Sequence, residues 1–247
     1  MAKENIIYGI HPVLEAIRSG QEIEKVLIQS GIRGESVQEL NKLLRDNQIP
    51  FQQVPVQKLD RVVRGNHQGI IAFVSQINYQ NITQVIPMLY EQGKTPFLLI
   101  IDRVTDVRNF GAIARTAECA GVDAIIIPSK GAAQINEDAV KTSSGALLQI
   151  TVCRDQNLKE VITFLQESGI RVVAVTEKTD DYYFSEDLSI PVALLLGSEE
   201  DGISPAYLKM ADSHVRIPLE GNIESLNVSV AAGVMMYEVV RQRRNMQ

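Results

Sequence analysis

Short runs of valine, isoleucine and leucine recur through the C-terminal part of this 247-residue chain. They predict strands at 97–101 (FLLII), 123–127 (DAIII), 150–153, 171–176 (RVVAVT) and 192–196 (VALLL). Helical periodicity separates most of them, at 111–120, 136–147 and 157–168. Strands that are apolar at every position and alternate with helices are typical of a parallel sheet covered on both faces. The sequence therefore predicts a parallel-sheet α/β fold for residues 96–247.

A second alternating pattern occupies the first 76 residues. It predicts helices at 11–20, 36–48 and 56–63 and strands at 25–30, 51–55 and 69–77, with Gly or Pro at most boundaries. Residues 77–95 have mixed polarity and predict a linker that includes a short helix. We therefore expect a smaller N-terminal α/β domain (1–76), a linker (77–95) and a larger C-terminal domain (96–247).

Several classes of protein are disfavoured by what the chain lacks. It has no run of about 18 apolar residues that could cross a bilayer, and its start, MAKENIIYG, does not resemble a secretory signal. Cys119 and Cys153 lack CxxC spacing, and each is interpreted as a small buried apolar residue. These features predict a cytoplasmic protein with no membrane partner. The three histidines are scattered, so no metal site is expected, and neither a G-x-G-x-x-G nor a P-loop motif occurs.

Polar and small residues follow the carboxyl ends of three predicted strands. Asp102 follows 97–101, Gly197 follows 192–196, and Pro218 follows a last short apolar strand. Because ligands bind beyond the carboxyl ends of strands in an open parallel sheet, these three segments should form one crevice.

The last of these segments, 217–233, runs through a Gly/Asn/Ser loop directly into a helix. Ser225, Ser229 and Gly233 recur every four residues and are predicted to line one stripe of this helix. Most of its other positions are apolar, which is typical of a helix buried against more than its own domain. We therefore expect a dimer interface beside a binding loop.

Three segments resemble, in order, the motif set of the SpoU/TrmH ribose 2'-O-methyltransferases. They are DRVTDVRNFGAIARTAECAG (102–121), GSEEDG (197–202) and IPLEGNIESLNVSVAAG (217–233). The chain start, IYGIHPVLEA (7–16), resembles the opening of the substrate-binding domain in bacterial members that methylate a guanosine of 23S ribosomal RNA. One departure is that family members often have Asp-Pro before the motif asparagine, whereas Val107 follows Asp106 here.

The resemblance implies methylation of a ribose 2'-hydroxyl in RNA, with S-adenosylmethionine as the methyl donor. It also implies a C-terminal trefoil knot, an L30e-like RNA-binding domain at the N-terminus and a homodimer packed through the knotted region. A tRNA 2'-O-methyltransferase and a non-catalytic RNA-binding assembly factor remain as alternatives.

By position in the motifs, Arg115 is assigned to stabilising the developing alkoxide or holding a neighbouring phosphate, because a guanidinium does not readily lose a proton. Asn109 would orient the ribose or the arginine, or cap a helix. Glu199 is expected to pair with an arginine, since an unpaired carboxylate at the mouth of a buried strand is costly. Asn227 and Ser229 match the third motif, and both helix capping and function remain open for them.

Backbone groups are expected to hold the cofactor, because no distinctive side-chain signature is visible. The resemblance places these contacts at Gly197, Ile217, Pro218, Ser225 and Leu226. On the RNA side, residues 1–76 hold 9 Lys+Arg and 8 Asp+Glu, whereas the remainder holds 15 and 22. The first third is therefore the expected RNA contact, with His67 in the turn RGNHQG as a candidate residue.

Overall fold

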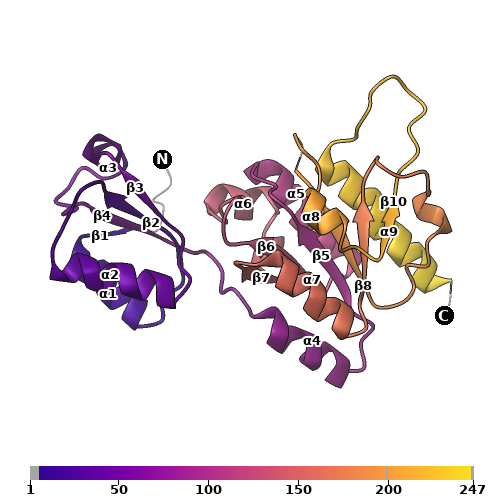
Figure 1. Ribbon diagram of the computed structural model, residues 1–247, viewed down its shortest axis with the longest axis horizontal. Helices are drawn as coiled ribbons and strands as arrows, with labels where there is room; N and C mark the ends of the chain where they lie inside the picture. Colours follow the sequence, from indigo (N-terminus) through magenta and orange to yellow (C-terminus); the bar gives the residue numbers. More distant parts are fainter. Residues whose placement is uncertain (1–5, 199, 246–247) are drawn as a thin grey trace. The chain divides into compact units, whose positions relative to one another are not determined.

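The structure is a computed structural model that describes residues 6–198 and 200–245, and it divides into two compact units (Figure 1). The first comprises the chain up to Asn78 with Ile135–Glu137, and the second comprises Tyr79–Gln134 and the chain from Asp138 onward. No helix in the described ranges is long and apolar enough to cross a membrane.

The first unit is built on a sheet of four strands within the described residues, in the order β1-β4-β2-β3. The strands are β1 (Ile6–Tyr8), β2 (Ile23–Gln29), β3 (Phe51–Val54) and β4 (Ile70–Val74). β2 pairs with β3 in parallel, whereas β4 is antiparallel to both β1 and β2. Helices α1 (Ile10–Arg18) and α2 (Glu35–Asp46) bury their apolar stripes on one face of this sheet. Helix α3 (Val56–Val62) buries Leu59 on the other face. Strand β1 was not predicted.

His67 lies in the turn before β4 and is buried, with 7% of its surface exposed. Its Nδ1 accepts a hydrogen bond from the Gly69 backbone N–H at 3.0 Å, and its Nε2 lies 3.0 Å from Oδ1 of Asp60. Both ring nitrogens are therefore used to hold the turn. The ring therefore supports the turn from inside, and a direct contact of His67 with RNA stays a prediction.

The second unit contains a wholly parallel sheet, as the Val/Ile/Leu runs predicted. Within the described residues its order is β10-β8-β9-β5-β6-β7. The strands are β5 (Phe97–Ile101), β6 (Ala124–Pro128), β7 (Thr151–Asp155), β8 (Arg171–Val175), β9 (Val192–Leu196) and β10 (Ser213–Val215). Because every strand points the same way, the carboxyl ends of β8, β9 and β5 meet at one edge of the sheet.

Helices cover both faces of this sheet (Figure 1). On one face α4 (Ile82–Glu91), α7 (Leu158–Glu167) and α8 (Pro205–Leu208) pack over a continuous apolar cluster. Strand residues alternate between faces, and on the other face α5 (Val107–Ala120) packs against α9 (Val228–Arg244), which also contacts β9. Gly111 lets α5 approach α6 (Glu137–Thr142) closely, since an added Cβ would lie 2.8 Å from Thr142 Cβ.

Three local predictions differ from the structure. The segment 77–95 does contain a helix, α4. The apolar residues of this helix are buried in the core of the second unit, so most of the segment belongs to that unit and does not form a separate linker. The helix predicted at 136–147 is interrupted by Ser144 and Gly145, which have positive φ, so that α6 is followed by a short 3-10 helix, η1 (Ala146–Leu148). Ser225 does not belong to the last helix, because the Asn227 side chain caps α9 and the helix begins at Val228.

The two cysteines lie in different environments. Cys153 on β7 is buried, as predicted, and burial raises its pKa to about 12, with a smaller contribution from Asp155. A thiol with that pKa stays protonated and unreactive at neutral pH. Cys119 is exposed on α5, so the prediction that it is buried is wrong. The buried stripe of α5 runs through Phe110, Ala114 and Ala117 instead.

Candidate active site

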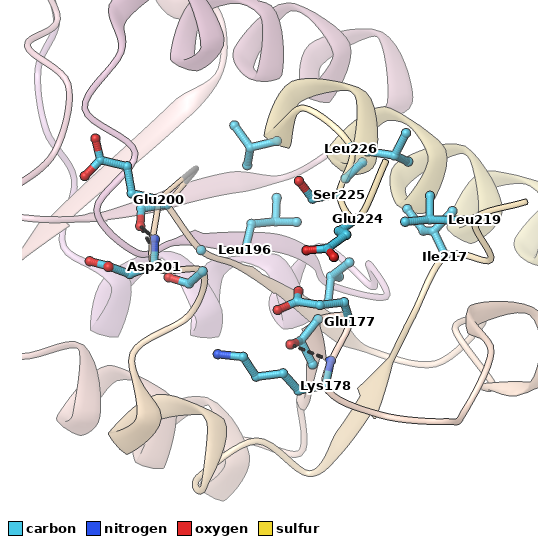
Figure 2. A pocket seen from close by; sticks show the side chains of 17 residues that line it. Glu177, Lys178, Leu196, Glu200, Asp201, Ile217, Leu219, Glu224, Ser225 and Leu226 are labelled. Carbon is cyan, nitrogen blue, oxygen red and sulfur yellow. Dashed lines mark hydrogen bonds between the residues drawn. The ribbon is translucent and has the colours of Figure 1, made fainter. Parts of the chain in front are cut away.

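A cavity of about 390 Å³ opens at the carboxyl ends of β8 and β9 (Figure 2). Its wall is formed by residues 175–178 at the end of β8, by the turn after β9 and by the segment from Ile217 to Val228. This volume lies within the range of roughly 300 to 1,000 Å³ that small-molecule sites occupy. Segments far apart in sequence thus meet at the edge of the sheet, where the strand ends predicted a crevice.

The wall of the cavity is apolar on one part and acidic on another. Its apolar side chains include Leu196, Ile217 and Leu226. Among the described residues of this wall, Glu177, Glu200, Asp201 and Glu224 are acidic and Lys178 is basic. Glu177 and Glu224 come from different chain segments and both extend into the cavity (Figure 2). A wall of this composition favours a partly apolar ligand that also carries positive charge.

The turn after β9 leaves no room for a side chain at its first position. A Cβ on Gly197 would lie 2.1 Å from both the Gly202 carbonyl carbon and the Ile203 nitrogen. Ser198 and Gly202 exchange backbone hydrogen bonds of 3.1 Å, and Gly202 has a φ of +67°. Only glycine at position 197 permits the chain to fold back this tightly on the cavity wall.

Asp102 and Arg103, directly after β5, hold this turn in place. Asp102 is 1% exposed, and its Oδ2 accepts a hydrogen bond of 2.7 Å from the Ser204 backbone N–H. Arg103 donates to Asp102 Oδ1 at 3.1 Å and to Asp201 at 3.3 Å. The hydrogen bond with Asp102 raises the pKa of Arg103 above its usual value. These hydrogen bonds from Asp102 and Arg103 to the turn were not predicted. A charged residue directly after a fully apolar strand could have indicated that Asp102 has a buried partner.

The N-termini of α5 and α9 are joined by two asparagines. Asp106 caps α5 by accepting from the Arg108 and Asn109 backbone N–H groups, at 2.9 and 2.8 Å. Asn227 caps α9 through its Oδ1, and its Nδ2 donates to Asn109 Oδ1 at 3.0 Å. Ser229 also donates its hydroxyl to Asn227 Oδ1 at 2.6 Å. Two positive helix ends therefore lie together beside the cavity segment that leads into α9.

The structure brings together some of the predicted site residues and not others. Gly197, Ile217, Ser225 and Leu226 line the cavity, whereas Pro218 does not. Asn109, Asn227 and Ser229 form one hydrogen-bonded group.

Arg115 is exposed on α5, does not line the cavity and has no hydrogen bond or ion pair within the described part of the chain. Glu199 lies outside the described residues, so its pairing with an arginine stays a prediction.

Sequence reasoning missed the residues at the end of β8. Glu177 and Lys178 line the cavity directly after this strand. The same rule that selected the ends of β5 and β9 applies to β8, so the signal was present in the strand prediction at 171–176. Across the described residues, no group of three His, Cys, Asp or Glu side chains is arranged to hold a metal ion.

Both parts of the chain match known protein families. Residues 96–237 match the SpoU rRNA Methylase family, and residues 6–80 match the family of RNA 2'-O ribose methyltransferase substrate-binding domains. A protein of the TrmH family of tRNA/rRNA methyltransferases from Staphylococcus saprophyticus is 36% identical over 241 residues, covering 98% of this chain and 97% of the relative.

Solved structures resemble the whole fold or its larger part. The SpoU methyltransferase AviRb from Streptomyces viridochromogenes, in complex with the cofactor AdoMet, has a TM-score of 0.62 at 25% identity, covering 97% of this chain and 90% of that one. An AdoMet-bound rRNA methyltransferase from Sinorhizobium meliloti gives 0.62 at 25%, covering 96% and 86%. A TrmH/SpoU tRNA modifying enzyme from A. aeolicus gives 0.56 at 27%, covering 66% and 85%. The chain therefore belongs to the SpoU/TrmH family of RNA methyltransferases.

Proposed function

We propose that this protein transfers a methyl group from S-adenosylmethionine to a ribose 2'-hydroxyl of RNA, and that the target is a guanosine of 23S ribosomal RNA. The observation that carries the proposal is the cavity at the carboxyl ends of β8 and β9, next to the linked N-termini of α5 and α9. The cavity has the size and charge for the methyl donor, and the helix ends offer a place for an anionic acceptor.

The residues of the cavity fit S-adenosylmethionine. Leu196, Ile217 and Leu226 provide an apolar wall for the adenine, and the closed turn at Gly197 lets backbone groups approach it. Glu177 and Glu224 offer carboxylates to the ribose hydroxyls and to the positive charges of the ligand. When bound, this cofactor supplies an electrophilic methyl group on a positively charged sulfur. The chain itself must supply the placement of the acceptor and the stabilisation of its charge.

On the acceptor side, Asn109, Asn227 and Ser229 position the ribose by hydrogen bonds. The positive N-termini of α5 and α9 stabilise the negative charge that grows on the 2'-oxygen as its proton passes to solvent water. Arg115 adds a positive charge, on the alkoxide or on a neighbouring phosphate.

Arg115 reaches this position in a homodimer. It is exposed on α5 and absent from its own chain's cavity wall, while the neighbouring helix α9 exposes Val230 and Tyr237, each 52% exposed. Apolar side chains at spacings of seven residues on one helix form a stripe that is typical of a helix–helix interface. We propose that α5 and α9 pack against a second copy, so that the partner subunit's Arg115 completes each site.

The coverage of the structural neighbours favours ribosomal RNA over tRNA. The Sinorhizobium meliloti rRNA methyltransferase covers 96% of this chain, whereas the A. aeolicus tRNA modifying enzyme covers 66%. The smaller match is consistent with a tRNA enzyme built without an equivalent of the first unit. Residues 6–80, which match a substrate-binding family, would then be the part that selects the larger RNA.

We also propose that the second unit carries the trefoil knot that the resemblance implies. Support comes from the strand order, in which β9 lies between β8 and β5, and from α9, which returns to pack against α5 after the 217–227 segment. Threading of this kind is rare among proteins, and it gives a physical reason for the crowded contacts around Gly197.

The function is tested by methyl transfer to defined RNA. The full-length protein is incubated with methyl-labelled S-adenosylmethionine and with unmodified transcripts of 23S ribosomal RNA or of tRNA, and the modified position is then mapped. We expect label on one guanosine of 23S RNA, and no label when that nucleotide carries a 2'-deoxyribose. Label on tRNA alone would reject the proposed substrate, and cofactor binding without transfer to either RNA would identify a non-catalytic binding protein.

A further inference from the structure

We propose that one face of the first unit, built around α3, is the RNA docking surface, and that it holds RNA phosphates while Tyr8 stacks on an unpaired base. This surface, named here the α3 surface, consists of Tyr8, Lys58, Arg61 and Arg64, all of which are exposed. The inference rests on the proposed function and names the part of the chain that recognises the substrate.

Charge is distributed unequally between the two helical layers of the first unit. Helices α1 and α2 carry three basic and four acidic residues, and Arg18 on this layer is paired with Glu15 and Glu39. The segment 56–69 carries three basic residues and one acidic residue, Asp60.

The carboxylate of Asp60 is already engaged by His67 Nε2. Lys58, Arg61 and Arg64 form no ion pair within the described part of the chain. Three unpaired cations on one side of a small domain are suited to a run of phosphates.

The sheet face beneath α3 is only partly covered. Residues two apart on a strand share a face, which places Tyr8 with Ile6, a neighbour of the α3 cluster. Phe73 packs at the edge of the same cluster, and the Lys25 ammonium lies 4.6 Å from the centre of its ring. A helix of seven residues cannot cover this face, and Tyr8 remains 44% exposed at its margin. Aromatic side chains and cations on one protein surface are the features that bind unpaired bases in single-stranded RNA.

The turn that presents Arg64 is rigid and lies against Tyr8. The His67 ring fixes it through Asp60 and Gly69, and the His67 backbone N–H donates to the Gly65 carbonyl at 2.9 Å. At Gly65 an added Cβ would lie 3.4 Å from the Tyr8 ring, so the turn and the ring are in close contact. A side chain held in this way loses little further entropy on binding, which favours the use of Tyr8 as a stacking surface.

The test compares two double variants with equal loss of charge in the full-length protein. Arg61→Gln with Arg64→Gln removes two cations from the α3 surface, and Lys42→Gln with Arg45→Gln removes two from α2 as the matched control. Binding to a labelled in vitro transcript of 23S ribosomal RNA is measured by filter retention at several salt concentrations.

We expect the α3 double variant to bind at least tenfold more weakly and to lower the slope of log affinity against log salt by about 1.5, as two lost phosphate contacts require. The α2 control should bind as the unsubstituted protein does. Tyr8→Leu should weaken binding roughly tenfold without changing the slope, because base stacking contributes without counterion release. Tyr8→Phe should retain affinity.

Several outcomes would overturn the proposal. One is an equal loss of RNA affinity in the α2 and α3 double variants, and another is an unchanged RNA affinity of the α3 double variant. A third is displacement of the RNA by polyglutamate as readily as by RNA of the same charge, which would indicate an acidic protein as the ligand. Affinity for S-adenosylmethionine and the melting temperature are measured on each variant. If the α3 double variant unfolds, RNA affinity is measured on Lys58→Gln alone, and an unchanged affinity of that variant overturns the proposal.

The α3 surface and the proposed reaction can fail independently. RNA binding through α3 without methyl transfer would remove the proposed function and leave the surface intact. Methyl transfer by the protein, together with an unchanged RNA affinity of the α3 double variant, would remove the surface and leave the proposed function intact.

Discussion

The absence of a Cβ atom at Gly197 decides the shape of the cavity wall. A Cβ there would overlap the backbone of Gly202 and Ile203 at 2.1 Å, and neither partner is a flexible side chain that could move aside. The brace from Asp102 to Ser204, at 2.7 Å, further limits how far the turn can shift. The position therefore tolerates no substitution without displacing the cavity wall.

We expect Gly197→Ala to abolish binding of S-adenosylmethionine or to destabilise the second unit by several kcal/mol, as overlaps with fixed backbone do. Gly221→Ala is the control, since its Cβ would meet nothing within 4 Å. Calorimetry with the cofactor and thermal unfolding measure the two effects. Normal cofactor affinity in Gly197→Ala would show that the turn opens readily and that the cavity is not preformed.

At the scale of elements, the two ends of α9 are fixed by different interactions. At its start, Asn227 caps the helix and also donates to Asn109 on α5. Near its end, Gln242 donates to the Glu186 carbonyl at 3.0 Å and accepts from the Leu188 backbone N–H at 2.8 Å. The helix is thus held against both α5 and the segment before β9.

The two roles of Asn227 can be separated by substitution. Asn227→Asp keeps a capping oxygen but loses the amide that donates to Asn109. We expect it to retain stability while methyl transfer falls by at least tenfold, whereas Asn227→Ala should also lose about 1 kcal/mol of stability through the cap. Urea unfolding and a methyl-transfer assay provide the two measurements. Full activity in Asn227→Asp would mean that the link to Asn109 has no catalytic role.

Glu238, which is 7% exposed on α9, makes the stability of this helix depend on pH. Two hydrogen bonds of 2.7 Å from Arg241 lower the pKa of Glu238 below its ordinary value of 4.5, and Gln242 assists at 2.8 Å. A depressed folded-state pKa contributes stability that is fully present above the unfolded-state value and is lost as pH falls through the folded-state value.

We therefore expect Glu238→Gln to lose about 1.5 to 3 kcal/mol of unfolding free energy at pH 7, the usual range for hydrogen bonds to a charged group. The difference from the unsubstituted protein should shrink below pH 4.5, as the carboxylate of the latter becomes protonated. Urea unfolding at pH 7 and at low pH tests this, with Glu118→Gln on the exposed side of α5 as the control. A difference that does not change with pH would assign the effect to packing.

At the scale of the whole molecule, the proposed site is complete only in a dimer. Arg115→Ala should abolish methyl transfer and leave cofactor affinity unchanged, because Arg115 does not line the cavity of its own chain. Mixing Arg115→Ala with Asn227→Asp protomers should restore activity, since each mixed dimer has one site with an intact asparagine and the partner subunit's Arg115. No recovery in confirmed mixed dimers would place Arg115 and Asn227 in the same chain's site.

Much of the architecture could be predicted from the sequence because the strands of the second unit are buried on both faces and apolar throughout. The crevice followed from the direction of parallel strands, which placed Gly197 on the cavity wall, whereas Leu226 was assigned from the family resemblance. Details set by tertiary contacts could not be predicted. The use of both His67 nitrogens depends on Asp60 and Gly69, and the start of α9 depends on which polar side chain caps it, Asn227 rather than Ser225.

The acidic wall of the cavity also has a consequence for turnover under the proposed function. Glu177 and Glu224 attract a ligand that carries a sulfonium, but donation of the methyl group leaves a neutral thioether. The same carboxylates then hold the spent ligand less tightly than the fresh one. Inhibition by the demethylated product would therefore be weak, because the product has lost the positive charge that the carboxylates attract. Fresh methyl donor, which still carries that charge, would replace it.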